Sequence, residues 1–204
     1  MSEIDLVVTC HPSATSLCAR IAEMVEQTLG KESSVVVDNL ARIDFNPIIS
    51  SAELRDYYQD QIPADVLTLV AHLRQAHRVT FVLPIWMYDM PAVLKGYFER
   101  VWRPYVAYGM DGDRISPLLI NIKRMVVIAT HGRSGTETLK VGDATRQFFD
   151  VSLPVLLPNL RSNVRFDLYS LDAPNPASIE RDLDLIRAHY LTDRAARAVS
   201  KDAR

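Results

Sequence analysis

The stretch LPIWMYDMPAVLKGYFERVW, residues 83–102, contains in order the end of a strand, a turn and the start of a helix. Pro91 suits the first turn of a helix, because its backbone angle is already helical and its missing N–H is not needed there. Leu94, Phe98 and Val101 then recur at helical spacing, so one face of this helix is expected to pack on a sheet. The stretch therefore predicts one strand–turn–helix unit.

The turn of this unit is unusual because it carries Trp86, Met87 and Tyr88, whereas turns between regular elements are usually polar. Such side chains suit three surroundings: the core, a subunit interface, or a flat conjugated ligand. On the helix that follows, Tyr97 and Trp102 lie off the sheet-facing positions, and we expect them at a dimer surface.

The same alternation of strand and helix extends in both directions from this unit. Short β-branched runs of the kind found in buried parallel strands alternate with segments of helical periodicity. The region 38–60 has no clean period and is expected to cross the surface, with room for a short helix. We expect strands at 4–9, 34–37, 79–84, 123–130 and 164–169, and helices at 15–29, 63–73, 91–102, 136–150 and 176–191.

This order of elements predicts an α/β fold with a doubly wound sheet of five parallel strands, because a (β/α)₈ barrel needs about 250 residues. The expected strand order is 2-1-3-4-5, and ligands of such sheets bind at the switch point between strands 1 and 3. We expect a single domain over 1–192 and a polar, frayed C-terminal tail over 193–204.

The composition excludes several classes of protein. A net charge of −2 argues against a dedicated nucleic-acid or membrane-surface binder. The start MSEIDLVVTC lacks the basic and long apolar regions of a secretory signal, and no apolar stretch reaches the roughly 20 residues of a membrane span. We expect a cytoplasmic protein without an integral membrane segment. Cys10 and Cys18 should be reduced, and these two cysteines do not have the spacing of metal ligands.

The loop after the first strand, HPSATS (11–16), places Ser13, Thr15 and Ser16 at the start of a helix. Free N–H groups and the positive end of the helix dipole suit a phosphate there, and helix capping alone is the alternative. The loop lacks the glycines and the lysine of a Walker A motif, and it does not match GxGxxG.

The loop after the fourth strand contains Gly132 and Gly135, which let the backbone approach a ligand closely, beside His131 and Arg133. A hydrogen-bonded structural histidine and a solvated arginine are the alternatives at these two positions. Taken together, the three loops would bring a phosphate site, an aromatic wall and a glycine-containing wall to one edge of the sheet. That combination fits a nucleotide-like cofactor with a planar ring, such as flavin mononucleotide (FMN).

The segment 83–108 resembles the signature of the flavodoxin-like NAD(P)H:quinone oxidoreductases, P-[LIV]-x-[WY]-x-x-x-P-A-x-L-K-G-[WY]-x-[DE]-R-V followed by an F-A-Y-like segment. HPSATSLCA near the N-terminus and DNLARIDFNPIIS (38–50) agree in order and spacing. The resemblance covers roughly residues 4–145, and LPVLLPNLRSN beyond it stays unexplained. The residues that fit the signature are Pro84, Pro91, Ala92, Leu94, Lys95, Gly96, Tyr97, Glu99, Arg100, Val101, Ala107 and Tyr108.

The resemblance implies a homodimeric flavoenzyme with shared active sites, which passes a hydride from NAD(P)H through FMN or FAD to a quinone-like acceptor. It implies that Tyr108 faces the substrate in a site completed by a second subunit, and that His131 is catalytic; no metal is required. The cofactor-binding residues that it implies are His11, Thr15, Ser16, Leu17, Pro84, Ile85, Trp86, Met87, Tyr88, Thr130, His131, Gly132 and Arg133.

The chain also departs from the family pattern. The Tyr and His that assist hydride transfer in better-known members correspond most closely to Thr138 and Ala144. Either His131 and backbone donors stabilise the reduced flavin, or quinone turnover is weak. Met87 replaces a second aromatic residue, and Cys18 replaces an asparagine. A flavin-binding accessory subunit of a membrane transporter is the alternative function, while the nearly neutral charge disfavours a one-electron carrier.

Overall fold

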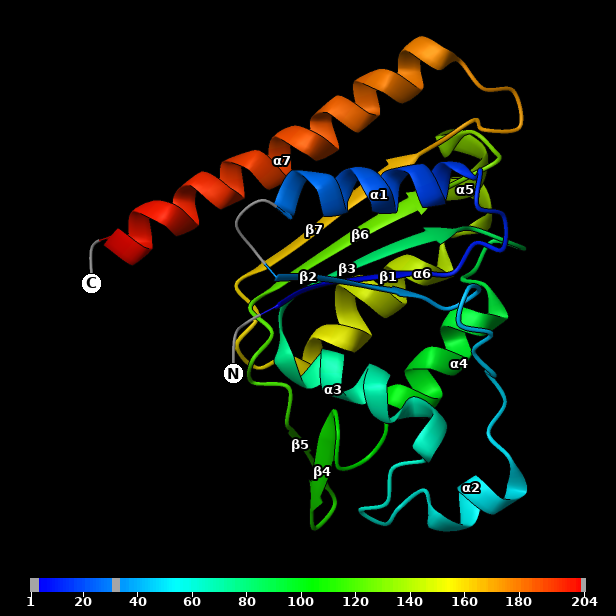
Figure 1. Cartoon of the computed structure of the whole chain (residues 1–204). Helices are drawn as coiled ribbons and strands as arrows, with labels where there is room; N and C mark the ends of the chain where they lie inside the picture. Colours follow the sequence, from blue (N-terminus) through cyan, green and yellow to red (C-terminus); the bar gives the residue numbers. More distant parts are fainter. Residues whose placement is uncertain (1–3, 31–33, 203–204) are drawn as a thin grey trace.

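The computed structural model describes residues 4–30 and 34–202. Its centre is a five-stranded, fully parallel sheet of order β2-β1-β3-β6-β7, which confirms the predicted doubly wound fold and the strand order 2-1-3-4-5 (Figure 1). The strands are β1 (Ile4–Thr9), β2 (Ser34–Asn39), β3 (Ala76–Pro84), β6 (Arg124–Thr130) and β7 (Ser162–Leu168).

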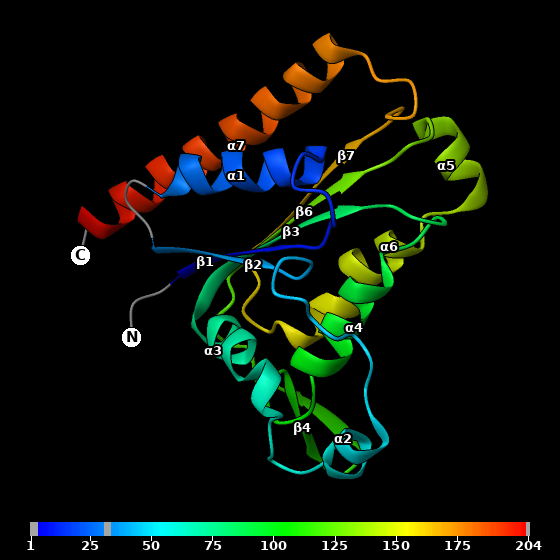
Figure 2. The ribbon, with the colours of Figure 1, turned by 45° about the vertical axis from the view of Figure 1, so that its right-hand side comes forward.

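Helices cover both faces of the sheet. Helices α1 (Leu17–Leu29) and α7 (Pro176–Asp202) lie on one face, and α3 (Leu67–Gln75) and α4 (Ala92–Val101) lie on the other (Figures 1 and 2). Val82 belongs to the core under α1 and α7, while its neighbour Phe81 belongs to the opposite core. The three central strands β1, β3 and β6 are buried on both sides and are therefore largely apolar. Among the described residues, no helix is both long and apolar enough to cross a membrane.

The helix boundaries follow local signals in the sequence. The Ser16 hydroxyl caps α1 by accepting a hydrogen bond from the Ala19 N–H, and α1 ends at Gly30. Pro91 precedes α4 as expected. The helix predicted from residue 63 begins with a 3-10 turn, η1 (Ala64–Val66), before α3. The region 38–60 contains the short helix α2 (Ser51–Asp56).

Two parts of the fold differ from the sequence prediction. A separate hairpin of β4 (Tyr108–Asp111) and β5 (Arg114–Pro117) was not predicted. The helix predicted over 136–150 is broken, because Gly142 has a φ of 94° and Asp143 caps a new helix. The resulting segments are α5 (Gly135–Val141), α6 (Ala144–Arg146), the π-helical η2 (Gln147–Ser152) and the 3-10 turn η3 (Leu153–Leu156).

The unexplained segment LPVLLPNLRSN has a packing role. It begins with η3 and leads into β7, and its Leu153 and Leu157 are buried in the core on the α4 side of the sheet. Its apolar residues therefore complete a core that α4 alone does not fill.

The C-terminal region was predicted as a frayed tail, and this prediction is wrong for residues 193–202, which continue α7. Asp193 forms ion pairs with Arg78 and, at 2.8 Å, with Arg124, which ties the helix to the sheet. Residues 203–204 lie outside the described residues. The extent of the single domain stays a prediction.

The prediction that Tyr97 and Trp102 form a dimer surface is also wrong, since their side chains are 0% and 3% exposed. Tyr97 packs edge-on against Phe45, and Trp102 packs against Phe98. The segment that contains Phe45 covers α4 from outside the sheet, so this helix is buried on two sides. Helical periodicity reveals only the sheet-facing side.

Candidate functional site

A pocket of about 760 Å³ lies at the carboxyl ends of β1, β3 and β6, where sheets of this topology bind ligands. Every cofactor-binding residue predicted from the sequence lines it except Thr15. The pocket is lined by His11, Ser13, Ser16, Leu17, Cys18, Pro84, Ile85, Trp86, Met87, Tyr88, Thr130, His131, Gly132, Arg133, Thr138, Leu171 and Asp172.

The β1 end of the pocket is formed by the loop that begins α1. Ser16 is the N-cap residue of this helix, and the Ser13 and Thr15 hydroxyl oxygens lie 3.0 Å apart. The Ser13 N–H donates to Nδ1 of His11 at 3.0 Å. Unpaired N–H groups of the first helical turn together with hydroxyl groups suit an anionic group such as phosphate.

The aromatic turn after β3 has a strained backbone. The Trp86 N–H donates to the Asp89 carbonyl at 2.9 Å, and the Asp89 N–H donates back to the Trp86 carbonyl at 3.0 Å. Between them Met87 and Tyr88 have positive φ angles of 51° and 65°, as in a type I′ turn. This conformation costs about 1–2 kcal/mol per non-glycine residue.

The strain keeps the side chains of this turn away from the core. Met87 is 93% exposed, and Trp86 and Tyr88 are also exposed on the pocket wall. Trp86 also meets His11 edge-on, with ring centroids 5.8 Å apart. Strained backbone tends to persist where function selects it, so the turn fits a ligand wall better than a packing role.

The loop after β6 is closed over by the loop after β7. A Cβ atom on Gly132 would lie 2.4 Å from Oδ1 of Asp172, so any other residue would displace this carboxylate. The Asp172 N–H donates to the Gly132 carbonyl at 3.1 Å. Leu171 and Asp172 line the pocket, although the sequence prediction named only three loops. The predicted parallel sheet could have indicated this fourth loop, because β7 ends at the same edge of the sheet as the other strands.

Two further lining residues were noted in the sequence only as departures from the family pattern. Cys18 approaches the Thr130 hydroxyl oxygen at 3.3 Å, and burial raises the pKa of its thiol to about 11. Thr138 is buried and donates to the Ser134 carbonyl at 3.0 Å. Ala144 begins α6 and does not line the pocket.

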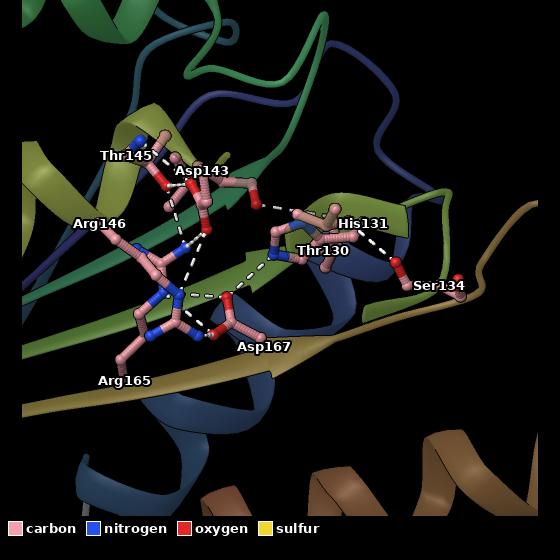
Figure 3. A network of polar contacts seen from close by, with 10 residues as sticks. Thr130, His131, Ser134, Asp143, Thr145, Arg146, Arg165 and Asp167 are labelled. Atoms are coloured by element: carbon pink, nitrogen blue, oxygen red, sulfur yellow. Dashed lines mark hydrogen bonds and ion pairs between the residues drawn. The ribbon is translucent and has the colours of Figure 1, made fainter. Parts of the chain in front are cut away.

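His131 is only 2% exposed, and its Nε2 lies 2.9 Å from Oδ1 of Asp167. The Asp167 carboxylate also accepts hydrogen bonds from Arg165 and Arg146, and Arg165 reaches Asp143 at 2.8 Å. Figure 3 shows these charged side chains gathered beside His131. Burial would raise the pKa of Asp167, but the His131 hydrogen bond and the Arg165 charge outweigh it and lower the pKa.

His131, Asp143 and Asp167 bring possible metal ligands within 4.8 Å of one another. Both carboxylates, however, accept hydrogen bonds from Arg165, whose charge would repel a cation at this position. The cluster is therefore a buried ion-pair network rather than a metal centre.

Tyr108, predicted to be catalytic, lies at the start of β4 and does not line this pocket. Its pKa is raised, first by burial and then by the neighbouring Tyr58, while Arg103 opposes the shift. Its predicted place in a site completed by a second subunit stays a prediction.

Comparisons with known proteins agree with this geometry. A family model described as a flavodoxin-like fold matches residues 6–154. The chain is 33% identical over 117 residues to an uncharacterised NAD(P)H oxidoreductase of Escherichia coli, and 35% identical over 130 residues to another of Haemophilus influenzae. These matches cover 56% and 62% of this chain, and only 59% and 63% of the two relatives.

The similarity to one solved structure extends over almost the whole chain. An NAD(P)H:quinone oxidoreductase from Methanothermobacter marburgensis superposes with a TM-score of 0.77 at 25% identity, covering 95% of this chain and 98% of that one. The family match ends at residue 154, so β7, the loop after it and α7 lie outside it.

Proposed function

Because the chain belongs to the family of flavodoxin-like proteins, we propose that it is a flavin-dependent NAD(P)H oxidoreductase. In this proposal NAD(P)H delivers a hydride through bound FMN to a quinone or a similar acceptor, with FAD as the alternative flavin. The pocket is the observation that carries the proposal. The start of α1, which suits an anion, and an aromatic wall lie within one cavity at the switch point of the sheet.

The residues present fit FMN at three places. The α1 start, with His11 and Ser16, suits the phosphate group. Trp86 and Tyr88, held outward by the strained turn, suit the flat isoalloxazine ring. Gly132, against which the Asp172 carboxylate packs, lets backbone groups approach the polar edge of that ring.

When bound, FMN supplies the reversible two-electron chemistry, and the protein supplies binding, orientation and exclusion of water. Trp86 and Tyr88 would hold the ring in one plane and shield it from solvent on that side. Arg133 is exposed at the pocket and adds a positive charge that favours an anionic ligand. No nucleophile or metal is required for these roles.

We further propose that the enzyme is a homodimer with shared active sites. Tyr108 does not line the pocket of its own chain, and in this proposal it acts on an acceptor in the site of a second copy. A cytoplasmic location would give access to NAD(P)H. Rapid NAD(P)H turnover by the purified protein would contradict the alternative role as an accessory subunit of a membrane transporter.

The direct experiment is a titration of the purified protein with FMN, followed by quenching of flavin fluorescence. We expect binding at micromolar concentration, and we expect Trp86→Ala to weaken it about fivefold, from the loss of about 1 kcal/mol of aromatic contact. Tyr58→Ala is the matched control, because Tyr58 is exposed and lies outside the pocket. Absence of FMN and FAD binding would reject the proposed function, whereas unchanged affinity and spectrum in Trp86→Ala would reject only the role of Trp86.

A further inference from the structure

Two histidines line the pocket, and each has one ring nitrogen engaged by a different kind of partner. At the β1 end, Nδ1 of His11 meets the backbone N–H of Ser13 at 3.0 Å. At the β6 end, Nε2 of His131 meets the carboxylate of Asp167 at 2.9 Å. Asp167 does not line the pocket, so this nitrogen faces the buried network and not the cavity (Figure 3).

The partners determine where the ring protons lie. A backbone N–H can only donate, so Nδ1 of His11 accepts, and the proton of the neutral ring lies on Nε2. An ionised carboxylate can only accept, so Nε2 of His131 must donate to Asp167. Asp167 is ionised because Arg165 and Arg146 both hold it.

The network around Asp167 also balances its charge. The network contains two carboxylates and two guanidinium groups, so the charges of these four side chains sum to zero. They belong to Asp143, Asp167, Arg146 and Arg165. Apart from Arg146, they are buried. A neutral His131 that donates one hydrogen bond satisfies Asp167 without adding charge, whereas an isolated buried charge would be costly.

We propose that Asp167 is a positioning residue that fixes the ring proton of His131 on Nε2 and leaves Nδ1 as a hydrogen-bond acceptor for the ligand. His11 has the opposite character, because its free atom is the Nε2–H donor. The pocket thus offers a donor near α1 and an acceptor near the β6 loop. It selects ligands with a phosphate-like acceptor at one end and an N–H donor at the other.

For the flavin this inference rests on the proposed function and makes it more specific. The imide N–H of the isoalloxazine ring is a donor of the required kind, and a neutral His131 would accept from it. With Nε2 committed to Asp167, His131 has no second proton to donate toward negative charge on the reduced ring. Backbone N–H groups or Arg133 would then carry that role, without the contribution from His131 that the sequence analysis considered.

The test is nitrogen and proton NMR of the flavin-free protein labelled in its histidine rings, at a pH where the rings are neutral, with His131→Gln to assign the signals. We expect the His131 proton on Nε2, exchanging slowly with water and shifted downfield by the carboxylate. A proton on Nδ1, or rapid averaging between the two nitrogens, would overturn the inference.

Asp167→Ala removes the acceptor, so it should abolish the slowly exchanging signal and weaken FMN binding roughly tenfold, the effect of about one unsatisfied buried hydrogen bond. Asp184→Ala is the matched control, because Asp184 is exposed on α7 and, among the residues that the structure describes, pairs with Arg187 on the same helix. A slowly exchanging signal that survives in Asp167→Ala would contradict the role of Asp167. Should that variant fail to fold, Arg146→Gln keeps the carboxylate and is expected to retain the signal, and its loss would count against the inference.

The two proposals fail separately. A fixed Nε2 proton in a protein that binds no flavin would reject the proposed function and leave the positioning role intact. FMN binding by a protein whose His131 proton is mobile would reject the positioning role alone. Inorganic phosphate is a useful third probe, because Asp167→Ala should not change its binding at the α1 end.

Discussion

Gly96 lies on α4 where the helix meets the segment around Pro47, and Gly96→Ala tests that contact. A Cβ atom at this position would lie 2.3 Å from both Cβ and the carbonyl oxygen of Pro47, and 2.5 Å from its Cα. An ordinary contact is about 3.4 Å, so α4 or the backbone at Pro47 must move by about 1 Å. Two of the three atoms belong to the backbone, so a side-chain rotation cannot relieve the clash.

The expected loss of stability follows from two opposing terms. Overpacking of this kind costs about 3 kcal/mol, and the higher helix propensity of alanine returns about 1 kcal/mol. The free energy of unfolding should therefore fall by about 2 kcal/mol. With a urea m-value of about 2.5 kcal/mol per molar, the unfolding midpoint should fall by about 0.8 M, followed by circular dichroism.

The matched control is Gly109→Ala in β4, where an added Cβ meets no atom within 4 Å. Its midpoint should equal that of the wild type or rise slightly, because alanine restricts the unfolded chain. A Gly96→Ala midpoint at or above that of the wild type, with an unchanged m-value, would refute the close packing of α4 on Pro47.

Two further predictions concern buried polar groups. Asp193→Ala should lower the free energy of unfolding by about 3 kcal/mol, because both Arg78 and Arg124 lose a close ion-pair partner, and the buried Arg78 keeps its longer pair with Asp5 at 3.5 Å. An unchanged urea midpoint would mean that this part of α7 is not held on the sheet. Burial raises the pKa of the Cys10 thiol to about 12 and that of Cys18 to about 11, so neither should be a thiolate at pH 8. A disulfide reagent such as DTNB should label both thiols in urea and neither in the native protein, and native labelling would show that the thiols are accessible.

The architecture of the sheet was predictable because its signals are local. Each strand is a short apolar run between helical periods, and the order of such units permits few topologies. The π-helical and 3-10 segments after Gly142 were not predictable, because their apolar residues follow neither the period of an α-helix nor that of a strand. Packing against the rest of the core determines their positions. The continuation of α7 was not predicted for a different reason. Its sequence is polar, and Asp193 holds it on the sheet by pairing with residues far away in the chain.

The position of the pocket followed from topology, whereas its inner structure did not. The sequence indicated aromatic residues after β3, but it could not show that Met87 and Tyr88 adopt positive φ angles, which no residue type there favours. It identified His131 as a candidate but gave no sign of its partner. His131 and Asp167 are 36 residues apart in the chain, and the pairing of β6 with β7 brings them together.

Some of the residues that shape this pocket come from outside the segment that the family model matches. That segment ends at residue 154, yet Asp167 lies on β7 and Asp172 lies in the loop after it. The first sets the proton of His131, and the second packs against Gly132. A relative could therefore share all three loops of the matched segment and still present a different hydrogen-bonding pattern to the same ring. Differences in flavin affinity and substrate preference between such relatives should accordingly be sought in β7 and the loop that follows it.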